Sequence, residues 1–188
     1  MSQTEIRIAG FGGQGVVLCG LVLGRAGCLY EGKHATLTQS FGPESRGGAC
    51  AVQIIVSDEP ILYPYVTQPD ILAVMSQEAA AKFVPTIRPR GTMICEEDLV
   101  NLDTTAESAT VHRVPSTRLA EELGRRLVQN IVMVGFIAAT SNVLSADAVR
   151  RSVRDSVPRG TEDINLRAFE AGYEYAQQKS ERAINKKA

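Results

Sequence analysis

Clustered metal ligands are absent from this sequence of 188 residues, which has four cysteines and two histidines. No two cysteines form a CxxC pair, and neither histidine has a cysteine or carboxylate at metal-ligand spacing. We therefore expect no zinc or iron–sulfur cluster in this chain, four buried thiols, and histidines at the surface or at a strand edge. The six residues are Cys19, Cys28, Cys50, Cys95, His34 and His112.

Long apolar runs and a surplus of basic residues are also missing. The longest apolar stretches, 16–23 and 131–139, fall well short of the roughly 20 residues that span a bilayer. The start MSQTEIRIAG has no basic end followed by an apolar segment, and the net charge is −1. The sequence predicts a cytoplasmic protein that binds neither membranes nor, in general, nucleic acid.

A complete set of catalytic residues is missing as well. No GxSxG nucleophile elbow occurs, and two histidines leave little for a Ser/His/Asp triad. The acidic run Glu96–Asp98 is interpreted as a solvated loop at a strand end. We assign no catalytic residue and no metal ligand to this chain.

Short segments rich in apolar and β-branched residues predict six strands. A helix over 14–30 follows the first strand, a second helix covers 77–83, and the pattern is wholly helical from Pro115 onward. Strands separated by helices or long connections predict an α/β fold, a Rossmann-like three-layer domain with a mostly parallel sheet and C-terminal helices. The predicted strands cover residues 5–9, 35–39, 49–57, 70–75, 91–95 and 110–114.

The predicted helices differ in how much of their surface is apolar. The helix over 14–30 and the stretch 130–140 are apolar on nearly all sides, which predicts that both are buried. The last helix opens at Thr161 and has acidic residues in its first turn. Leucines at four-residue spacing predict one further helix, with Leu119, Leu123 and Leu127 on its face. The predicted N-caps are Ser76, Ser116 and Ser145.

A glycine loop, GFGGQG at residues 10–15, joins the first predicted strand to the first predicted helix. Such a loop brings unpaired backbone N–H groups and the positive end of a helix dipole to one point, which attracts an anion, usually phosphate. Gly10, Gly12 and Gly13 allow special dihedrals and a close approach of the ligand, and Gly15 allows the helix to pack tightly. Gln14 adds an amide donor and acceptor. The alternative interpretation is that the glycines only form a tight turn.

The glycine loop alone is weak evidence for a dinucleotide. An NAD site expects an acidic residue at the end of the second strand, where this sequence has Thr38-Gln39-Ser40. A free-standing Rossmann-type nucleotide-binding module or NAD(P)-dependent reductase therefore stays the alternative hypothesis, with Arg46 available for the extra phosphate of NADP.

A second glycine-rich loop, SFGPESRGGAC at 40–50, follows the second predicted strand. It is expected at the same carboxyl edge of the sheet as the glycine loop, where ligands bind in open α/β sheets. Arg46, beside Gly47 and Gly48, either pairs with a phosphate or carboxylate or forms an ion pair with Glu44 or an acidic group of a partner.

Four blocks in this order resemble the gamma subunit of the 2-oxoacid:ferredoxin oxidoreductases, most closely the 2-oxoglutarate type. The resemblance covers roughly residues 4–145. The blocks are GFGGQGVVLCGLVLGRAG (10–27), TQSFGPESRGGACAVQIIVSD (38–58), PDILAVMSQEAAAKF (69–83) and RLVQNIVMVGFIAA (126–139).

The resemblance implies a complex that decarboxylates a 2-oxoacid on thiamine diphosphate, reduces ferredoxin and forms an acyl-CoA. In this family the alpha and beta partners hold thiamine diphosphate and Mg²⁺, and beta or a ferredoxin-like delta subunit holds the [4Fe-4S] clusters. The gamma chain is then structural, is inactive in isolation, and contributes to the coenzyme A site. The implied contacts are Gly10, Gly12, Gly13, Gln14 and Gly15, and less directly Ser40, Arg46, Gly47 and Gly48.

The resemblance also implies that residues 1–188 form one gamma domain. Its core covers about 4–145, followed by C-terminal helices over 145–179 and a polar tail over 180–188.

Overall fold

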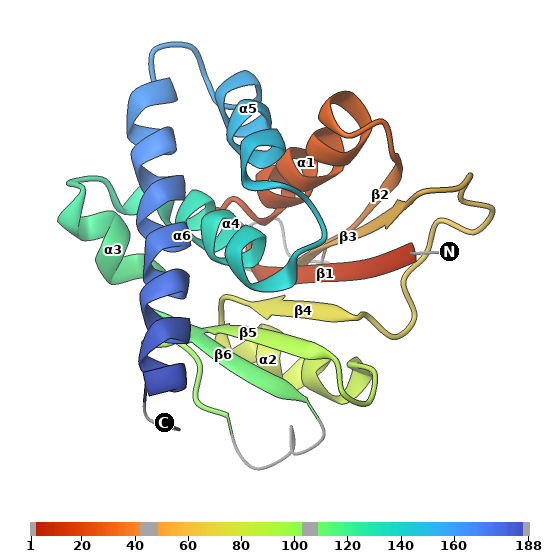
Figure 1. Ribbon diagram of the computed structural model, residues 1–188. Coiled ribbons are helices and arrows are strands. Elements are labelled where there is room, and N and C mark those ends of the chain that lie inside the picture. Colours follow the sequence, from red (N-terminus) through yellow and green to blue (C-terminus); the bar gives the residue numbers. More distant parts are fainter. Residues whose placement is uncertain (1–2, 42–48, 103–108, 186–188) are drawn as a thin grey trace.

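A computed structural model describes residues 3–41, 49–102 and 109–185. Within these ranges six strands form one sheet with helices on both faces (Figure 1). The strands are β1 (Gln3–Phe11), β2 (His34–Phe41), β3 (Ala49–Ser57), β4 (Ile71–Val74), β5 (Thr92–Glu96) and β6 (Thr110–Val114). The helices are α1 (Val16–Arg25), α2 (Gln77–Phe83), α3 (Ser116–Glu122), α4 (Gln129–Ser141), α5 (Ala146–Ser156) and α6 (Glu162–Asn185). Shorter turns are η1 (Ala26–Tyr30), η2 (Val84–Thr86) and η4 (Arg126–Val128).

The sheet has the order β2-β3-β1-β4-β5-β6 and is mostly parallel. β1, β4, β5 and β6 run in one direction, while β3 is antiparallel to both of its neighbours. β2 therefore runs in the same direction as β1. The predicted mostly parallel α/β fold is confirmed, and the reversed strand β3 is a feature that the sequence pattern did not indicate.

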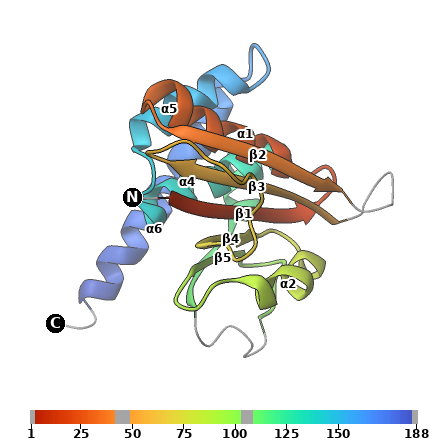
Figure 2. The same cartoon turned by 90° about the vertical axis from the view of Figure 1, so that its right-hand side faces the viewer.

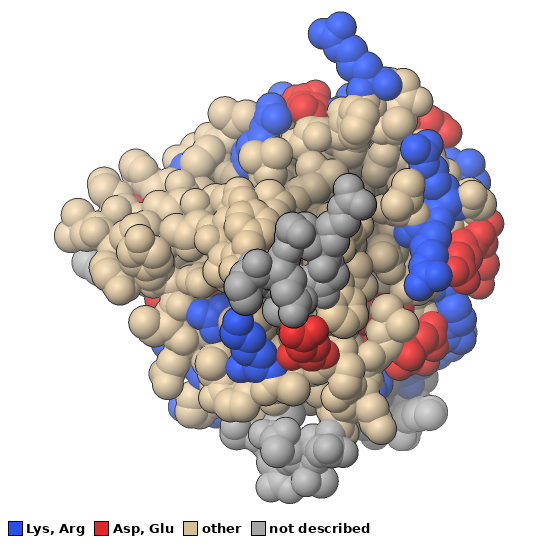
Figure 3. Space-filling view, turned by 180° about the vertical axis from the view of Figure 1, so that it is seen from behind, with Lys and Arg blue, Asp and Glu red and all other residues tan. Residues whose placement is uncertain are grey.

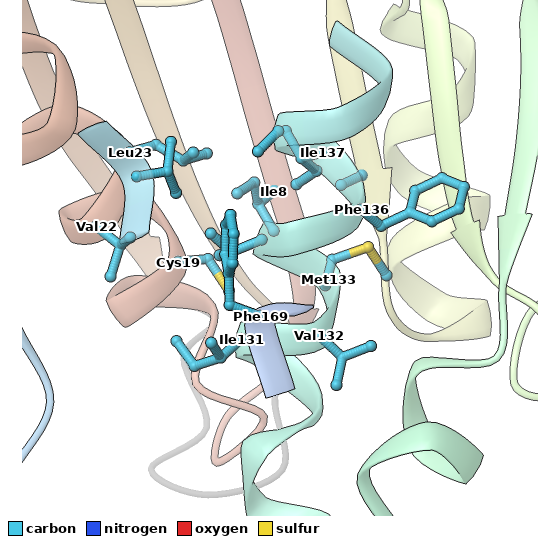
Figure 4. Close-up of a cluster of buried hydrophobic side chains, with 14 of the residues drawn as sticks. Ile8, Cys19, Val22, Leu23, Ile131, Val132, Met133, Phe136, Ile137 and Phe169 are labelled. Atoms are coloured by element: carbon cyan, nitrogen blue, oxygen red, sulfur yellow. The ribbon is translucent and has the colours of Figure 1, made fainter. Parts of the chain in front are cut away.

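The larger core lies between the sheet and the helices α1, α4, α5 and α6 (Figure 4). Figure 2 shows α6 and α2 on opposite sides of the sheet. Phe136 of α4 and Phe169 of α6 are fully buried, and residues 129–138 of α4 are buried on every side, as its composition predicts. No helix in the described ranges is both long and apolar enough to cross a membrane.

Helices α4 and α6 touch through their backbones at two glycines. A Cβ atom on Gly135 would lie 2.0 Å from the carbonyl oxygen of Phe169, and one on Gly172 would lie 1.9 Å from that of Val132. Only glycine fits at either position in the observed packing. The two helices approach this closely because each has a glycine where it contacts the backbone of the other.

The second, smaller core lies on the α2 face and includes Ala9, Leu72, Val74 and Met93. α2 begins where the sequence predicts, because the Ser76 hydroxyl accepts a hydrogen bond from the Ala79 N–H at 3.2 Å.

Two further predictions on the helices have different outcomes. Ser145 caps α5 in the same way that Ser76 caps α2, by a 3.2 Å bond from the Ala148 N–H, so this cap is confirmed. The helix predicted over 14–30 begins at Val16, and its last five residues form the π-helical turn η1.

The prediction that the acidic run at the end of β5 is solvated is wrong for Glu96, whereas Asp98 is exposed in the turn that follows. Glu96 is fully buried, and its carboxylate accepts hydrogen bonds from the N–H groups of Asp98, Leu99 and Thr117 at 2.7–3.0 Å. Glu96 thereby supplies the acceptor at the start of α3 that we predicted from Ser116, which is instead the first helical residue. Glu97 and Asp98, which are partly exposed, form ion pairs with Arg118.

Two further predictions are wrong, one on the helix predicted to carry Leu127 and one on the burial of the cysteines. α3 ends at Glu122, and Gly124 then has a φ of 82°, so the chain turns before Leu127, which is 70% exposed. Cys28 is exposed, whereas the other three cysteines are buried as expected. His34 is exposed on β2 and His112 is half-buried on β6, in agreement with strand-edge positions.

Candidate functional site

The glycine loop lies at the carboxyl end of β1, directly before α1 (Figure 1). Gly12 and Gly13 are exposed. Gly13 has a φ of 99° and Gly15 a φ of 74°, both in the region that favours glycine. Among residues 3–41, 49–102 and 109–185, no atom would lie within 4 Å of a Cβ atom on Gly13, so none of these residues fills the space beside it.

The first backbone N–H groups of α1 lie at this point. Gly15 is the N-cap, no side chain in the described part of the chain caps the helix, and its first turn contains no acidic residue. The N–H of Cys19 is the first to bond within the helix, to the Gly15 carbonyl at 3.1 Å. The backbone N–H groups of Val16, Val17 and Leu18 thus have no acceptor inside the helix, and the helix dipole adds partial positive charge. This position suits an anion.

The side chain of Gln14 fixes the shape of the loop. Its Oε1 accepts from the Phe11 N–H at 2.7 Å, and its Nε2 donates to the Met75 carbonyl at 3.0 Å. Gly10 is required beneath it, because a Cβ atom there would lie 2.5 Å from Gln14 Oε1. Gln14 thus ties the loop to the end of β4, and a direct contact between this amide and a ligand stays a prediction.

Asn130 is a supporting residue that the sequence interpretation missed. Its Nδ2 donates to the Gly15 carbonyl at 3.3 Å, and a Cβ atom on Gly15 would lie 2.4 Å from that nitrogen. Asn130 is 4% exposed, at the start of the buried helix α4. The signal in the sequence is the amide pair Gln129-Asn130 directly before a stretch that is otherwise apolar.

The end of β2 lies at the same edge of the sheet as the glycine loop. Cys50 of β3 pairs with Gly10 on one side and with Phe41 on the other, so the carboxyl ends of β1 and β2 flank the start of β3. Ser40 is exposed there. The other predicted residues of this loop, Arg46, Gly47 and Gly48, lie outside the described residues.

Similarity to known proteins gives the family. The model of the pyruvate ferredoxin/flavodoxin oxidoreductases matches residues 5–175. The chain belongs to this family. The resemblance inferred from the four sequence blocks is thereby confirmed.

Within the pyruvate ferredoxin/flavodoxin oxidoreductase family, one similar relative is the 2-oxoglutarate synthase subunit KorC of Methanocaldococcus jannaschii. It is 47% identical over 178 residues, which cover 94% of this chain and 95% of that protein. The gamma subunit of a keto/oxoacid ferredoxin oxidoreductase from Geobacter sulfurreducens has a similar structure, with a TM-score of 0.86 and 33% identity over 95% of this chain and 98% of that one.

A longer protein contains the same fold. The 2-oxoglutarate:ferredoxin oxidoreductase of Magnetococcus marinus, solved with 2-oxoglutarate, coenzyme A and succinyl-CoA bound, aligns with a TM-score of 0.81 and 21% identity. The alignment covers 95% of this chain and 32% of that one. The fold of this family member is therefore found elsewhere as about one third of a longer polypeptide.

The thiols of this member of the oxidoreductase family are poor nucleophiles where they are buried. Burial raises the pKa of Cys19 to about 12, and it also raises the pKa values of Cys50 and Cys95. Among residues 3–41, 49–102 and 109–185, no group of three or more His, Cys, Asp or Glu side chains is placed to hold a metal ion. The chemical feature of the described residues that points to a ligand is the anion position at the start of α1.

Proposed function

We propose that this chain is the gamma subunit of a 2-oxoglutarate:ferredoxin oxidoreductase and that its glycine-loop edge contributes to the coenzyme A site. The observation that carries the second part is the N-terminus of α1, which no side chain of the described residues caps, next to the exposed Gly12 and Gly13. The diphosphate of coenzyme A is an anion that such a helix end attracts. The relative of known structure solved with coenzyme A has the same fold, which supports the assignment.

The complex as a whole would oxidatively decarboxylate 2-oxoglutarate to succinyl-CoA and reduce ferredoxin in the cytoplasm. We assign thiamine diphosphate, Mg²⁺ and the [4Fe-4S] clusters to alpha, beta and a ferredoxin-like delta subunit. This chain would act as one gamma domain, with the core and C-terminal helices in the ranges predicted above. Its residues bind and orient the nucleotide end of coenzyme A, while the reacting centres lie in the partners.

The neighbouring strand favours coenzyme A over NAD. β2 ends in Ser40 and Phe41, with no carboxylate to hold the ribose hydroxyls that an NAD site binds. The ribose of coenzyme A carries a 3′-phosphate, which an acidic side chain here would repel. Ser40 would lie beside this part of the nucleotide, as would Arg46, Gly47 and Gly48.

The test is steady-state kinetics of the assembled complex with Gly13→Asp. An added carboxylate near the diphosphate costs roughly 1.4 kcal/mol at an intermediate dielectric, or about a tenfold rise in the KM for coenzyme A. The KM for 2-oxoglutarate should stay unchanged. Gly13→Asn, which has the same shape without the charge, should raise the KM for coenzyme A less.

Gly160→Asp is the matched control. Gly160 is also exposed, has a φ of 82° and would have nothing within 4 Å of an added Cβ atom, but it lies in the turn between α5 and α6. This variant also places an aspartate at a positive φ, but in a different turn, so it should keep both KM values. An unchanged KM for coenzyme A in Gly13→Asp would refute the proposed site.

Gln14→Ala tests the support of the loop. It removes the bonds to Phe11 and Met75, so the loop should lose its shape and the KM for coenzyme A should rise, with that for 2-oxoglutarate unaffected. A larger rise in the KM for 2-oxoglutarate would contradict this role.

A further inference from the structure

The segment from Glu59 to Pro69, here called the arm, joins β3 to β4 and displays apolar side chains. Leu62 is 96% exposed, Tyr63 61% and Tyr65 55%. The two tyrosine rings contact each other edge to face, with centroids 5.5 Å apart. In Figure 3 the segment lies at the left of the view, where the projecting surface is tan, the colour of residues other than Lys, Arg, Asp and Glu.

The composition of the arm is unusual for a solvated loop. Residues 60–69 contain no charged side chain, whereas 22% of the whole chain is charged. Loop surfaces in water normally carry such charges, and exposed apolar groups that cluster mark a surface that another molecule covers. Tyrosine and other large apolar side chains without charges are typical of the centre of a protein–protein interface.

The base of the arm is fixed to the sheet. Both backbone groups of Val66 are bonded: its N–H donates to Gln53 Oε1 at 2.9 Å, and its carbonyl accepts from Arg7 Nη2 at 2.6 Å. Arg7 also donates to the Thr86 hydroxyl at 2.7 Å and is only 6% exposed. Val66, directly after Tyr65, is therefore held at a defined position, which reduces the conformational entropy lost when the arm docks.

Asp70, the residue directly after the arm, is anchored as well. The Asp70 N–H donates to the Glu5 carbonyl, and the Asp70 carboxylate accepts from the Glu5 N–H, both at 2.8 Å. These bonds lie at the start of β1, whereas the glycine loop follows its end. The arm and the glycine loop thus occupy opposite edges of the sheet, and a partner on one leaves the other open (Figure 1).

We infer that the arm docks this chain onto the subunit of the oxidoreductase that carries the remainder of the enzyme, by placing Leu62 and the two tyrosines in an apolar socket. This inference rests on the proposed function. The occupant is a protein surface of the same enzyme, because the same fold forms 32% of the longer M. marinus chain and is there continuous with further polypeptide. The socket is uncharged, since a charge buried against these side chains would have no partner.

Binding of this chain to the other subunits tests the inference. The purified chain is titrated onto the purified remainder of the complex, and the dissociation constant is measured for wild type, Leu62→Asp and Tyr63→Asp. We expect each arm variant to bind at least about tenfold more weakly, because a carboxylate replaces a buried apolar contact. The thermal stability of the isolated variants should match wild type, since both side chains are exposed in the free chain.

Leu127→Asp is the matched control. Leu127 is a leucine of similar exposure, 70%, but it lies in η4 between α3 and α4, away from the arm. It should change the dissociation constant less than about threefold, and none of the variants should change the KM for coenzyme A in the assembled complex.

The outcomes separate the inference from the proposed function. If Leu62→Asp binds with wild-type affinity, or if Leu127→Asp loses as much affinity as Leu62→Asp, the docking role of the arm is overturned. The proposed function is not affected by either result, as long as the wild-type chain binds the other subunits. A homodimer of the isolated chain that Leu62→Asp breaks would show that a second copy occupies the arm, and would overturn the inference too. If the wild-type chain binds no such subunits, both proposals fail.

Discussion

The contact between α4 and α6 makes a sharp prediction for Gly172→Ala. The new Cβ atom would lie 1.9 Å from the Val132 carbonyl oxygen and 2.8 Å from its carbon. Both atoms belong to the backbone in the buried part of α4, so no side-chain rotation can relieve the clash. The helices must therefore separate by at least about 1 Å, which weakens the dispersion contacts along their whole crossing.

The expected loss of stability follows from two opposed terms. Overpacking of a core typically costs about 1–3 kcal/mol, and a backbone clash belongs at the upper end of that range. Alanine in place of glycine in a helix interior stabilises the helix by about 1 kcal/mol. We expect the free energy of unfolding to fall by about 2 kcal/mol, which corresponds to a Tm lower by roughly 4–8 °C in a chain of this length.

Gly24→Ala in α1 is the matched control for the helix propensity. The nearest atom to its Cβ position is Ile54 Cγ2 at 3.9 Å, an ordinary contact. This variant should therefore gain about 0.5–1 kcal/mol. The stability of the Gly172→Ala and Gly24→Ala variants is measured by thermal and urea unfolding of the purified chain. Gly172→Ala with a Tm equal to or above that of wild type would refute the close helix contact.

Three further predictions concern buried and strained groups. Glu96→Ala should lower the free energy of unfolding by about 3 kcal/mol in urea titrations, because three backbone N–H groups lose their acceptor, and Glu96→Gln should cost less; equal stability of all three proteins would contradict the role of the carboxylate. Arg90 has a φ of 64°, so Arg90→Gly should raise the free energy of unfolding by about 0.5–1 kcal/mol, and a Tm below that of wild type would show that the turn is not strained. The pKa of Cys19 is about 12 in the folded chain and near 9 in the unfolded one, so the unfolded state releases its proton first and stability should fall as the pH rises from 9 to 12. Cys19→Ala should show a smaller slope over that range, and an identical slope would exclude this thiol as the cause.

The elements that the sequence predicted best are those with strong local signals. Ala49–Ser57 is rich in β-branched residues, and the residue bounds of β3 match the prediction. α2 also matches, because Ser76 caps it and its residues favour a helix. These signals lie within the segments themselves, so no knowledge of the tertiary structure is needed to read them.

One wrong prediction depends on a contact between distant parts of the chain, and another on a local turn. Glu96 lies in an acidic run that is typical of an exposed loop, yet it is buried because α3, twenty-one residues further on, provides the N–H of Thr117 as a donor. Leu127 continues a four-residue spacing, but Gly124 turns the chain before it. A periodic pattern shows which positions a helix could bury and does not show where the helix ends.

The candidate site was predictable in its position and only partly in its construction. A strand, four glycines and a helix are adjacent in the sequence, so the anion position follows from local order. The bond from Gln14 to Met75 spans 61 residues, and that from Asn130 to Gly15 spans 115. Neither pairing has a periodic or motif signal, so the residues that hold the loop in shape became visible only in the folded chain.

The exposure of Cys28 gives the chain one position for selective chemical labelling. The other three thiols are buried, so a maleimide dye at neutral pH should react at this residue. Cys28 lies in η1, between α1 and the edge strand β2. A fluorophore there would report on the arrival of partner subunits by energy transfer, without a cysteine having to be added or removed.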